Sequence, residues 1–557
     1  MNRTFVIGAD CSSNFGMREL LDHATGYAGR DKKLQAPLKS LLASPRPGID
    51  AKLTPDLVQS CRIGGSQTDD ASSETRWVGP MHGDQASSIA QNIRARLTWA
   101  GFVLGMLAVL LVGFRNLFDW ERELADIPAL PLATGMVVAG VWFLWLIWPI
   151  RSGVRLPDAA ETSILRRVVV MGLLLRVLML WSVPALEDDF HRYLWDGAVV
   201  ANGFNPYGVV PAAATEEGVT GVISELAEQA GSVHDRINHP HLRTIYPPVA
   251  ELAFAIAYLA EPWSLLAWRL VCLTCEASTL WLLLTLLKEM GRSPLLVMIY
   301  WLNPLVIKEL MNSAHMEAIL VPLVLATVLL TVRGHLIAAA GALGLAAGAK
   351  VWPLMLAPLV LRPLISQPVR LAAAVCVLAV VSVLCATPPW LAGFDDTSGF
   401  VAYATIWKSN SALFPVLEKL SGSIVSAVGL DAAYAGRLAR LAVAAALSTI
   451  TAAMIIRPIS GTEDLIRRVT LLVGALVLLA PAQFPWYLVW VQPFLVLRPV
   501  LGLLAATALM PVYYASFYFR AHDNYYIFSD WIVWAIWIPI WLLLLREAWY
   551  RRSLSRT

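Results

Sequence analysis

Residues 97–114 read LTWAGFVLGMLAVLLVGF, without a single charged side chain. Because about 20 apolar residues cross the hydrocarbon core of a bilayer, this stretch predicts a transmembrane helix. Similar stretches follow one another to residue 545, and the 557-residue chain is 57% hydrophobic and only 15% charged. Soluble domains carry about 25% charged residues. The sequence therefore predicts an all-α polytopic membrane protein rather than a series of soluble domains.

The apolar stretches suggest about 12 to 14 membrane crossings, judged by the spanning length. The clearer ones are 97–114, 131–150, 164–184, 264–287, 317–332, 371–389, 433–456, 500–519 and 531–545. Shorter or proline-broken ones are 247–261, 294–307, 335–349, 351–362, 467–481 and 486–498. We interpret 247–261 as a partial or re-entrant helix, because it is short and begins at Pro247-Pro248.

Lysine and arginine in short loops set the orientation of a membrane protein, with the basic loops on the cytoplasmic side. Placing the basic clusters and both termini in the cytoplasm puts the remaining loops on the outer side. That outer side then receives 185–246, 308–316, Lys350, 390–430, 481–486 and 520–530. Most of the unusual polar residues lie in these outer segments, so we expect the functional site there.

The chain divides into a polar region, 1–93, and a membrane domain, 94–557. We expect the first to be a largely disordered cytoplasmic extension, and the second to carry a large outer loop at 185–246 and another at 390–430. The net charge of +3 is too small to favour nucleic acid as a partner. Cys272 and Cys275 lie inside an apolar run without a further ligand pair, so we interpret them as packed thiols.

The motif EDDFHRYLWDG, residues 187–197, directly follows an apolar stretch. Three consecutive carboxylates at a membrane surface repel one another unless a partner offsets their charge. A carboxylate here could act as the general base that takes a proton from a hydroxyl. In a helix Asp188, Arg192 and Asp196 would share one face. The alternative is a solvated helix cap formed by Asp188 or Asp189.

Two further motifs place cations near the outer surface. In WLNPLVIKELMNSAHMEA, Lys308, Asn312 and His315 share one helical face and could hold a phosphate. Alternatively, Lys308 extends to the interface and His315 is satisfied locally. Lys350, in GAKVWP, is a lone cation between apolar stretches and needs an anionic partner, which a lipid phosphate could supply.

Aromatic and polar residues fill the other outer segments. Tyr246 and the segment PAQFPWYLVW, which contains Gln483, Trp486 and Tyr487, suit binding to a sugar or to the lipid interface. We interpret Asp395-Asp396 as a solvated loop. His239 and His241 lack a third residue that could complete a zinc site with them. No Walker, zinc-protease or nucleophile-elbow motif occurs in a fitting context.

Together, these strings resemble the bacterial GT-C superfamily of membrane glycosyltransferases. They are most similar to the polyprenyl-phosphate-mannose-dependent mannosyltransferases, including the α-1,6 type and glycosyltransferase family 87. The carriers of the resemblance, which covers about residues 160–545, are EDDFHRYLWDG, NPYG, IYPPVAE, NPLVIKELMNSAHMEA, GAKVWP and PWYLVW.

The resemblance implies a GT-C fold in the inner (plasma) membrane, with catalysis on its outer, periplasmic face. An acid in the first long outer loop would be the base, which points to Asp188, with Asp189 as the second candidate. A hexose, mannose in the first place, would move from a polyprenyl phosphate to a hydroxyl of an envelope lipid or glycan. The expected donor-phosphate ligands are Lys350, Arg192, Lys308 and His315, and the expected substrate contacts are Glu187, Asn312, Tyr246, Gln483, Trp486 and Tyr487. We expect neither metal nor cofactor.

The competing interpretation is a polytopic secondary transporter or a flippase for an anionic or lipid-linked solute. Many spans, broken helices and charges at membrane depth are typical of such transporters as well. The long acidic outer loop and the lack of an evident internal repeat favour the enzyme.

Overall fold

The computed structural model describes residues 83–119, 121–218 and 220–554, and most of the predicted polar extension lies outside them. The described part is helical and contains no strand, only an isolated parallel bridge between Ser409 and Ala482. This confirms the all-α polytopic prediction. The longer helices are α4 (Gly83–Gly113), α5 (Ala129–Ile147), α6 (Asp158–Met179), α11 (Leu265–Glu289), α14 (Glu317–Val332), α15 (Leu336–Ala349), α17 (Pro368–Ala392), α19 (Leu413–Ala427), α20 (Tyr434–Ile456), α21 (Gly461–Leu479) and α26 (Val533–Leu554).

The described helices that are long and apolar enough to cross a membrane are fewer than the crossings that the sequence suggested. Among the described residues seven are long and apolar enough, or eight if a bent pair counts as one span, against the predicted 12 to 14. Apolar stretches were counted as crossings, but several form helices of only 10–17 residues, such as α10 (Pro248–Ala260), α14 and α15. A helix of that length is shorter than the roughly 20 residues that a crossing needs.

The bent pair joins η6 (Pro294–Val297) and α12 (Met298–Trp301) to α13 (Pro304–Ile307) and the π-helix η7 (Lys308–Asn312), with a bend of 54°. Asn303 lies at the break, and its side-chain oxygen accepts hydrogen bonds from the backbone nitrogens of Leu305 and Val306. Pro304 begins the second helix, where its missing N–H costs nothing. The π-helix after the break carries Lys308 and Glu309, both of which are buried.

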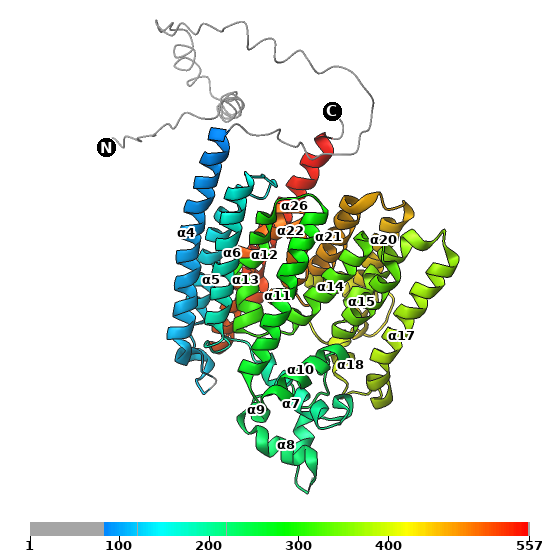
Figure 1. The fold of residues 1–557 in the computed structure, drawn as a ribbon. Coiled ribbons are helices and arrows are strands. Elements are labelled where there is room, and N and C mark those ends of the chain that lie inside the picture. The colour runs from blue at the N-terminus through cyan, green and yellow to red at the C-terminus, as the bar shows by residue number, and fades with distance from the viewer. Residues whose placement is uncertain (1–82, 120, 219, 555–557) are drawn as a thin grey trace, which may run out of the picture. The chain divides into compact units, whose positions relative to one another are not determined.

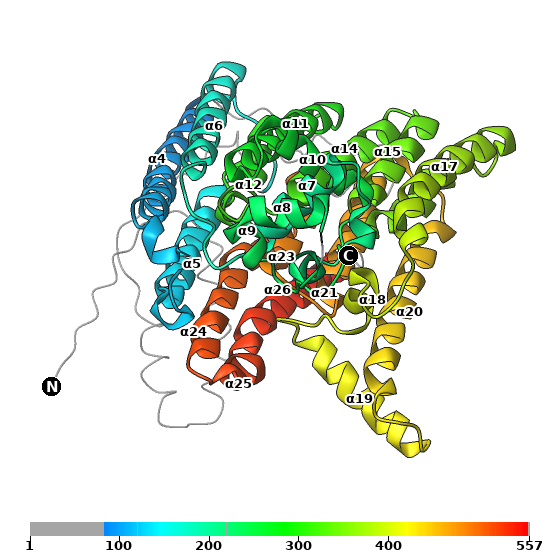
Figure 2. The same ribbon diagram turned by 90° about the horizontal axis from the view of Figure 1, so that it is seen from below.

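The long helices run side by side, and the segment between α6 and α11 collects at one end together with α18 (Figure 1). There lie α7 (Asp189–Ala201), α8 (Val222–Ala230), α9 (Ser232–Asp235), α10 and α18 (Gly399–Thr405). The beginning of α4 and the end of α26 lie at the opposite end. The end that carries α7 also receives α24 (Ala515–Ala521), as the view from below shows (Figure 2).

An ion pair inside the bundle joins α6, α11 and α12. Arg176 lies 2.7 Å from Glu276, and the exposed fraction of both side chains is 0%. Arg176 also donates to the carbonyl oxygen of Trp301, and Tyr300 donates to Glu276. Because buried charges are costly unless paired and hydrogen-bonded, this network fixes the three helices against one another.

Short 3-10 and α-helices connect the long ones. They are η2 (Arg115–Phe118), η3 (Leu124–Asp126), η4 (Pro206–Gly208), η5 (Pro211–Thr215), η6 (Pro294–Val297), η8 (Trp352–Leu356), α16 (Ala357–Leu361), η9 (Arg362–Leu364), η10 (Pro485–Trp490), α22 (Gln492–Leu497), α23 (Leu501–Leu509), η11 (Met510–Tyr514), α25 (Tyr525–Ile527) and the π-helix η12 (Phe528–Ile532). Several of them carry the walls of the cavity described next.

Candidate functional site

A cavity of about 480 Å³ opens at the end of the bundle where α7 begins. Its lining comes from every segment that the pattern of basic loops placed on one side of the membrane. These contributions include Glu187, Asp188, Asp189, Met316, Lys350, Tyr403, Trp407, Phe484, Trp486, Tyr487 and Arg520. These segments therefore meet at one cavity, together with Phe118, Leu124 and Ile127, which the sequence had not placed among them. Which side of the membrane they face stays a prediction.

Two adjacent aspartates stand at the start of α7 in the cavity wall. The Asn238 side-chain nitrogen donates to both, at 2.9 Å from Asp188 Oδ1 and 2.8 Å from Asp189 Oδ1. On its other side, Asp189 Oδ2 lies 3.6 Å from His315 Nδ1, and Tyr193 donates to it at 3.4 Å. Asp189 is thus held from several directions, whereas Asn238 is the one side-chain hydrogen-bond partner of Asp188 among the described residues.

The two carboxyls differ in acidity. Burial, and then repulsion from Asp189, raises the pKa of Asp188 to about 6. Burial acts on Asp189 too, but its interactions with His315 and Asn238 outweigh it and hold the pKa of Asp189 below the ordinary value. A general base is most effective when its pKa lies near the working pH. The pKa of Asp188 therefore suits a general base, whereas the lowered pKa of Asp189 favours a carboxylate that stays ionised.

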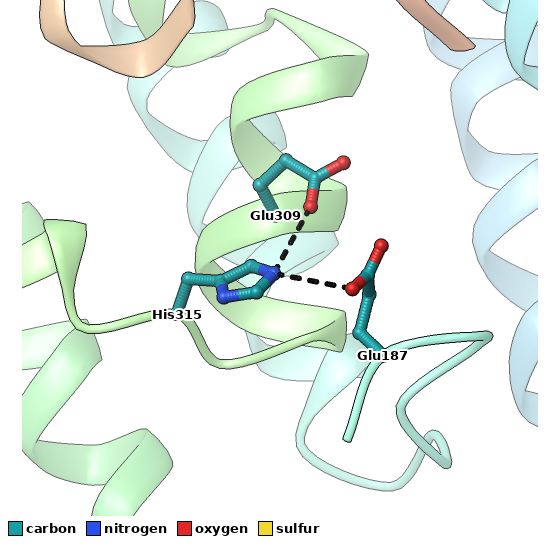
Figure 3. Close-up of side chains that lie close together, drawn as sticks. All are labelled: Glu187, Glu309 and His315. Atoms are coloured by element: carbon teal, nitrogen blue, oxygen red, sulfur yellow. Dashed lines mark ion pairs between the residues drawn. The ribbon is translucent and has the colours of Figure 1, made fainter. Parts of the chain in front are cut away.

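Behind the aspartates lies a buried cluster of Glu187, Glu309 and His315 (Figure 3). His315 Nε2 is 3.5 Å from Glu309 Oε2 and 4.0 Å from Glu187 Oε2. Lys308 Nζ is 3.9 Å from Glu187 Oε1 and 3.7 Å from Glu309 Oε2. Tyr514 receives a hydrogen bond from Lys308 and donates one to Glu309. The lysine and the glutamates thus offset one another inside the protein.

The cluster in Figure 3 offers one nitrogen and two carboxylate oxygens within 4.8 Å of one another, a set that metal ions such as Zn²⁺ can use. However, the ammonium of Lys308 already faces both carboxylates. A divalent ion between them would be repelled by that charge. We therefore interpret the cluster as an ion-pair network, and the expectation of a metal-free reaction stays a prediction.

Backbone strain surrounds this cluster. Leu186 and Ala314, the residues directly before Glu187 and His315, have φ angles of 62° and 58°. A residue other than glycine in this region costs of order 1–3 kcal/mol and persists only where the surroundings hold it. Hydrogen bonds supply that hold, because the Trp268 indole donates to Ala314 O and the Ala185 N–H to Asn312 Oδ1. Such strained positions cluster at functional sites.

Arg192 and Lys350, both predicted phosphate ligands, line the cavity. Arg192 lies 2.9 Å from Asp196 and donates to Leu242 O. Lys350 lies 2.5 Å from Glu317 and 4.6 Å from the centre of the Tyr487 ring. Both cations are thus engaged by carboxylates of the protein.

Among the aromatic candidates, Tyr246, Trp486 and Tyr487 line the cavity, and Trp486 stacks on His315 with ring centroids 4.2 Å apart. Glu187 lines it as well. The other predicted contacts lie behind the walls and do not form part of the lining: Lys308, His315, Asn312 and Gln483. Asn312 donates to Ser182 and to Val183 O, and so holds the segment that leads into the acidic motif.

Sequence reasoning missed several residues that shape the site. Glu309 and Glu317 stood inside a motif that was noted, and Asn238 directly precedes His239, but none of the three was assigned a role. Each is a charged or amide side chain near apolar residues, and this pattern could have indicated a buried contact, since buried polar groups require partners. Asp395, interpreted as a solvated loop residue, is exposed but pairs with Arg243 at 2.7 Å and so joins the two outer loops.

Comparison with known proteins points to one family. Residues 95–365 match the family model described as "Alpha-(1->6)-mannopyranosyltransferase, N-terminal domain". A curated relative, alpha-(1->6)-mannopyranosyltransferase A of Mycobacterium tuberculosis, is 28% identical over 251 residues, which are 44% of this chain and 46% of the relative. The chain thus matches about half the length of that relative. No solved structure matches.

Proposed function

We propose that this chain is a membrane mannosyltransferase, because residues 95–365 match the family model of the alpha-(1->6)-mannopyranosyltransferases. The observation that carries the proposal is the pair Asp188 and Asp189 in the wall of a cavity at the end of the helical bundle. The matched region ends at residue 365 and includes these aspartates, Asn238, His315 and Lys350.

In the proposed reaction, Asp188 takes the proton from an acceptor hydroxyl. The hydroxyl oxygen forms a bond to the anomeric carbon of the mannose, while the bond from that carbon to the phosphate oxygen breaks. The electron pair of the broken bond leaves with the lipid phosphate. Asp188 is suited to this step because its pKa of about 6 leaves it ionised near neutral pH and still basic.

Asp189 supports this step without accepting the proton. Its charge, held by His315 and Asn238, raises the pKa of Asp188 and can stabilise the positive charge that develops on the sugar ring. Tyr246, Trp486 and Tyr487 provide flat apolar surfaces with polar tips, which suit a sugar.

The proposed donor is a polyprenyl phosphate that carries mannose, and the proposed acceptor is a hydroxyl of an envelope lipid or glycan. Two features favour a lipid-linked donor over a nucleotide sugar. The cavity lies where the bundle meets the polar loops, which a lipid can reach from between helices. The loops assigned to the cytoplasm are short and basic, without a glycine-rich phosphate-binding motif.

The enzyme can be separated from a transporter or flippase by turnover in detergent. Purified full-length chain should transfer mannose from polyprenyl-phosphate-mannose to a lipid acceptor extract without any membrane gradient, and Asp188→Asn should not. If the wild-type chain binds the lipid sugar but releases it unchanged, while reconstituted vesicles move it across the bilayer, the transporter interpretation replaces the enzyme.

For localisation we propose the inner membrane, with the cavity on the periplasmic or outer side and the termini in the cytoplasm. Single cysteines introduced at Thr215 and Ala160 in a cysteine-free background test this with a membrane-impermeant reagent. Thr215→Cys should react from outside and Ala160→Cys should not. The reverse pattern would invert the topology and remove the outer-face site.

A further inference from the structure

Five lysines and arginines line the cavity, and four of them face a carboxylate of the protein. The pairs are Arg192 with Asp196, Arg243 with Asp395, Lys350 with Glu317, and Lys408 with Glu418. The fifth, Arg520, has no ion pair within the part of the chain that the structure describes. It is therefore the cavity cation whose charge is available to an incoming anion.

Arg520 lies at the end of α24 and is exposed. Its guanidinium sits 4.6 Å from the centre of the Tyr525 ring and 5.9 Å from that of Phe517. Such aromatic contacts orient the planar group and leave its N–H donors free for a phosphate. Arg520 is thus positioned by rings rather than neutralised by an acid.

The cavity wall beside Arg520 is apolar. α24 packs against η3 and α5, and the lining there includes Phe118, Leu124, Ile127 and Phe517. Leu124 is 37% exposed although it is a large hydrophobic residue. A cation at the rim of an apolar wall matches a ligand with one charged group attached to a hydrocarbon chain.

We propose that Arg520 binds the phosphate of the lipid-linked donor, and that Phe118, Leu124, Ile127 and Phe517 contact the first isoprene units of its chain. This inference rests on the proposed function and names a donor site for it. A phosphate at Lys350 or Arg192 would meet Glu317 or Asp196, whereas Arg520 has no such competitor.

This placement also separates donor from acceptor. Seen from below, α24 lies beside α5, while α18 and the segment after it lie on the other side of α26 (Figure 2). Trp407 and Lys408 line the cavity from that second side. In a single displacement the incoming hydroxyl and the leaving phosphate occupy opposite faces of the anomeric carbon. If the donor phosphate is bound at Arg520, the side of the cavity that Trp407 lines remains open to the acceptor.

The test uses the purified full-length chain and measures inhibition of mannose transfer by polyprenyl phosphate, polyprenol and inorganic phosphate. The variants are Arg520→Gln, Arg520→Lys and, as a control, Arg437→Gln, which removes an exposed arginine of α20 outside the cavity lining. We expect polyprenyl phosphate to inhibit the wild-type chain far better than polyprenol. In Arg520→Gln this preference should fall about tenfold or more, the loss typical of a charged hydrogen bond.

The controls should distinguish loss of the positive charge at Arg520 from a general disturbance of the structure. Arg437→Gln should keep the wild-type preference, Arg520→Lys should retain part of it, and the inhibition by polyprenol should stay unchanged in both Arg520 variants. Inorganic phosphate should not inhibit at the same concentrations, because it lacks the hydrocarbon chain. An unchanged preference in folded Arg520→Gln, or equal inhibition by inorganic phosphate, would overturn the inference.

A second variant covers the case in which Arg520→Gln does not fold. Leu124→Glu adds an anion to the exposed apolar wall and leaves Arg520 intact. It should weaken inhibition by polyprenol, because an apolar contact is lost, and weaken inhibition by polyprenyl phosphate more, because the new carboxylate also repels the phosphate. Equal inhibition by polyprenyl phosphate in Leu124→Glu and the wild type would contradict the site. If the wild-type chain does not use the lipid donor at all, the proposed function fails whatever the Arg520 variants do.

Discussion

Lys350 Nζ lies 2.5 Å from Glu317 Oε1, and the Glu317 side chain is only 1% exposed. The charge of Lys350 is therefore offset before any substrate arrives. A variant that removes the lysine alone leaves a buried carboxylate unpaired, which costs about 3–5 kcal/mol. Loss of activity in such a variant would report damage to the site rather than loss of a phosphate ligand.

The first prediction separates these effects. Lys350→Met should lower the melting temperature and the transfer rate, whereas the double variant Lys350→Met with Glu317→Gln should recover most of both, because no unpaired charge remains. Thermal melting and donor KM measure the two quantities. If the double variant is folded and still cannot use the donor, Lys350 itself binds the donor phosphate.

The second prediction concerns the two aspartates. Asp188→Asn should lower kcat by the roughly 10²–10⁴-fold that a lost general base typically costs. Asp189→Asn should cost less, because Asp189 acts through its charge. Both asparagines are nearly isosteric with the aspartates, so each variant is the structural control of the other. An inactive Asp189→Asn beside a nearly normal Asp188→Asn would move the base by one residue.

The third prediction is a pH dependence. Because transfer requires ionised Asp188, whose pKa is about 6, kcat/KM should rise with pH through that value and level off above it. Asn238 donates to both carboxylates and thereby lowers the pKa of each, so Asn238→Ala should move the acid limb to higher pH. The same midpoint in wild type and Asn238→Ala would show that the profile belongs to another group.

The fourth prediction concerns stability. Glu276→Gln leaves the buried Arg176 without its anionic partner and should reduce the free energy of unfolding by about 3–5 kcal/mol. The matched control is Glu289→Gln, which breaks the exposed pair with Arg333 and should change it by at most about 1 kcal/mol. Thermal melting in one detergent compares the two. Equal losses of stability in Glu276→Gln and Glu289→Gln would show that burial does not determine the cost of breaking an ion pair.

The fifth prediction is that chelators do not stop the reaction. Lys308 faces the same carboxylates that a metal would need, so transfer should persist after dialysis against EDTA. Metal analysis of the purified chain provides the control. Stoichiometric metal whose removal abolishes transfer, and whose return restores it, would assign Glu187, Glu309 and His315 as ligands.

Features that depend on residues close together in the chain could be predicted from the sequence. Apolar runs predicted the helical membrane domain, and the alternation of basic loops predicted that several of the segments which line the cavity lie on one side of the membrane. Both predictions depend on composition along the chain. Glu187, Asp188 and Asp189 stood out because three adjacent carboxylates at a membrane surface repel one another unless a partner offsets their charge.

Information that depends on tertiary contact could not be predicted from the pattern. Nothing near Lys308 or Lys350 in the sequence shows that Glu187 or Glu317 will face them, and Asn238 reaches the aspartates only because the loop folds back. The length of each helix is a further property that the apolar pattern does not determine. An apolar stretch such as 248–260 forms a helix, but the number of residues in that helix decides whether it is long enough to cross a membrane.

The central claim is that this chain transfers mannose from a lipid phosphate. The most direct measurement incubates the purified full-length chain separately with polyprenyl-phosphate-mannose and with GDP-mannose, each with the same lipid acceptor extract, and follows the mannosylated product by mass spectrometry. The account predicts product from the lipid donor only, and none from either donor with Asp188→Asn. Product from GDP-mannose and none from the lipid donor would contradict it.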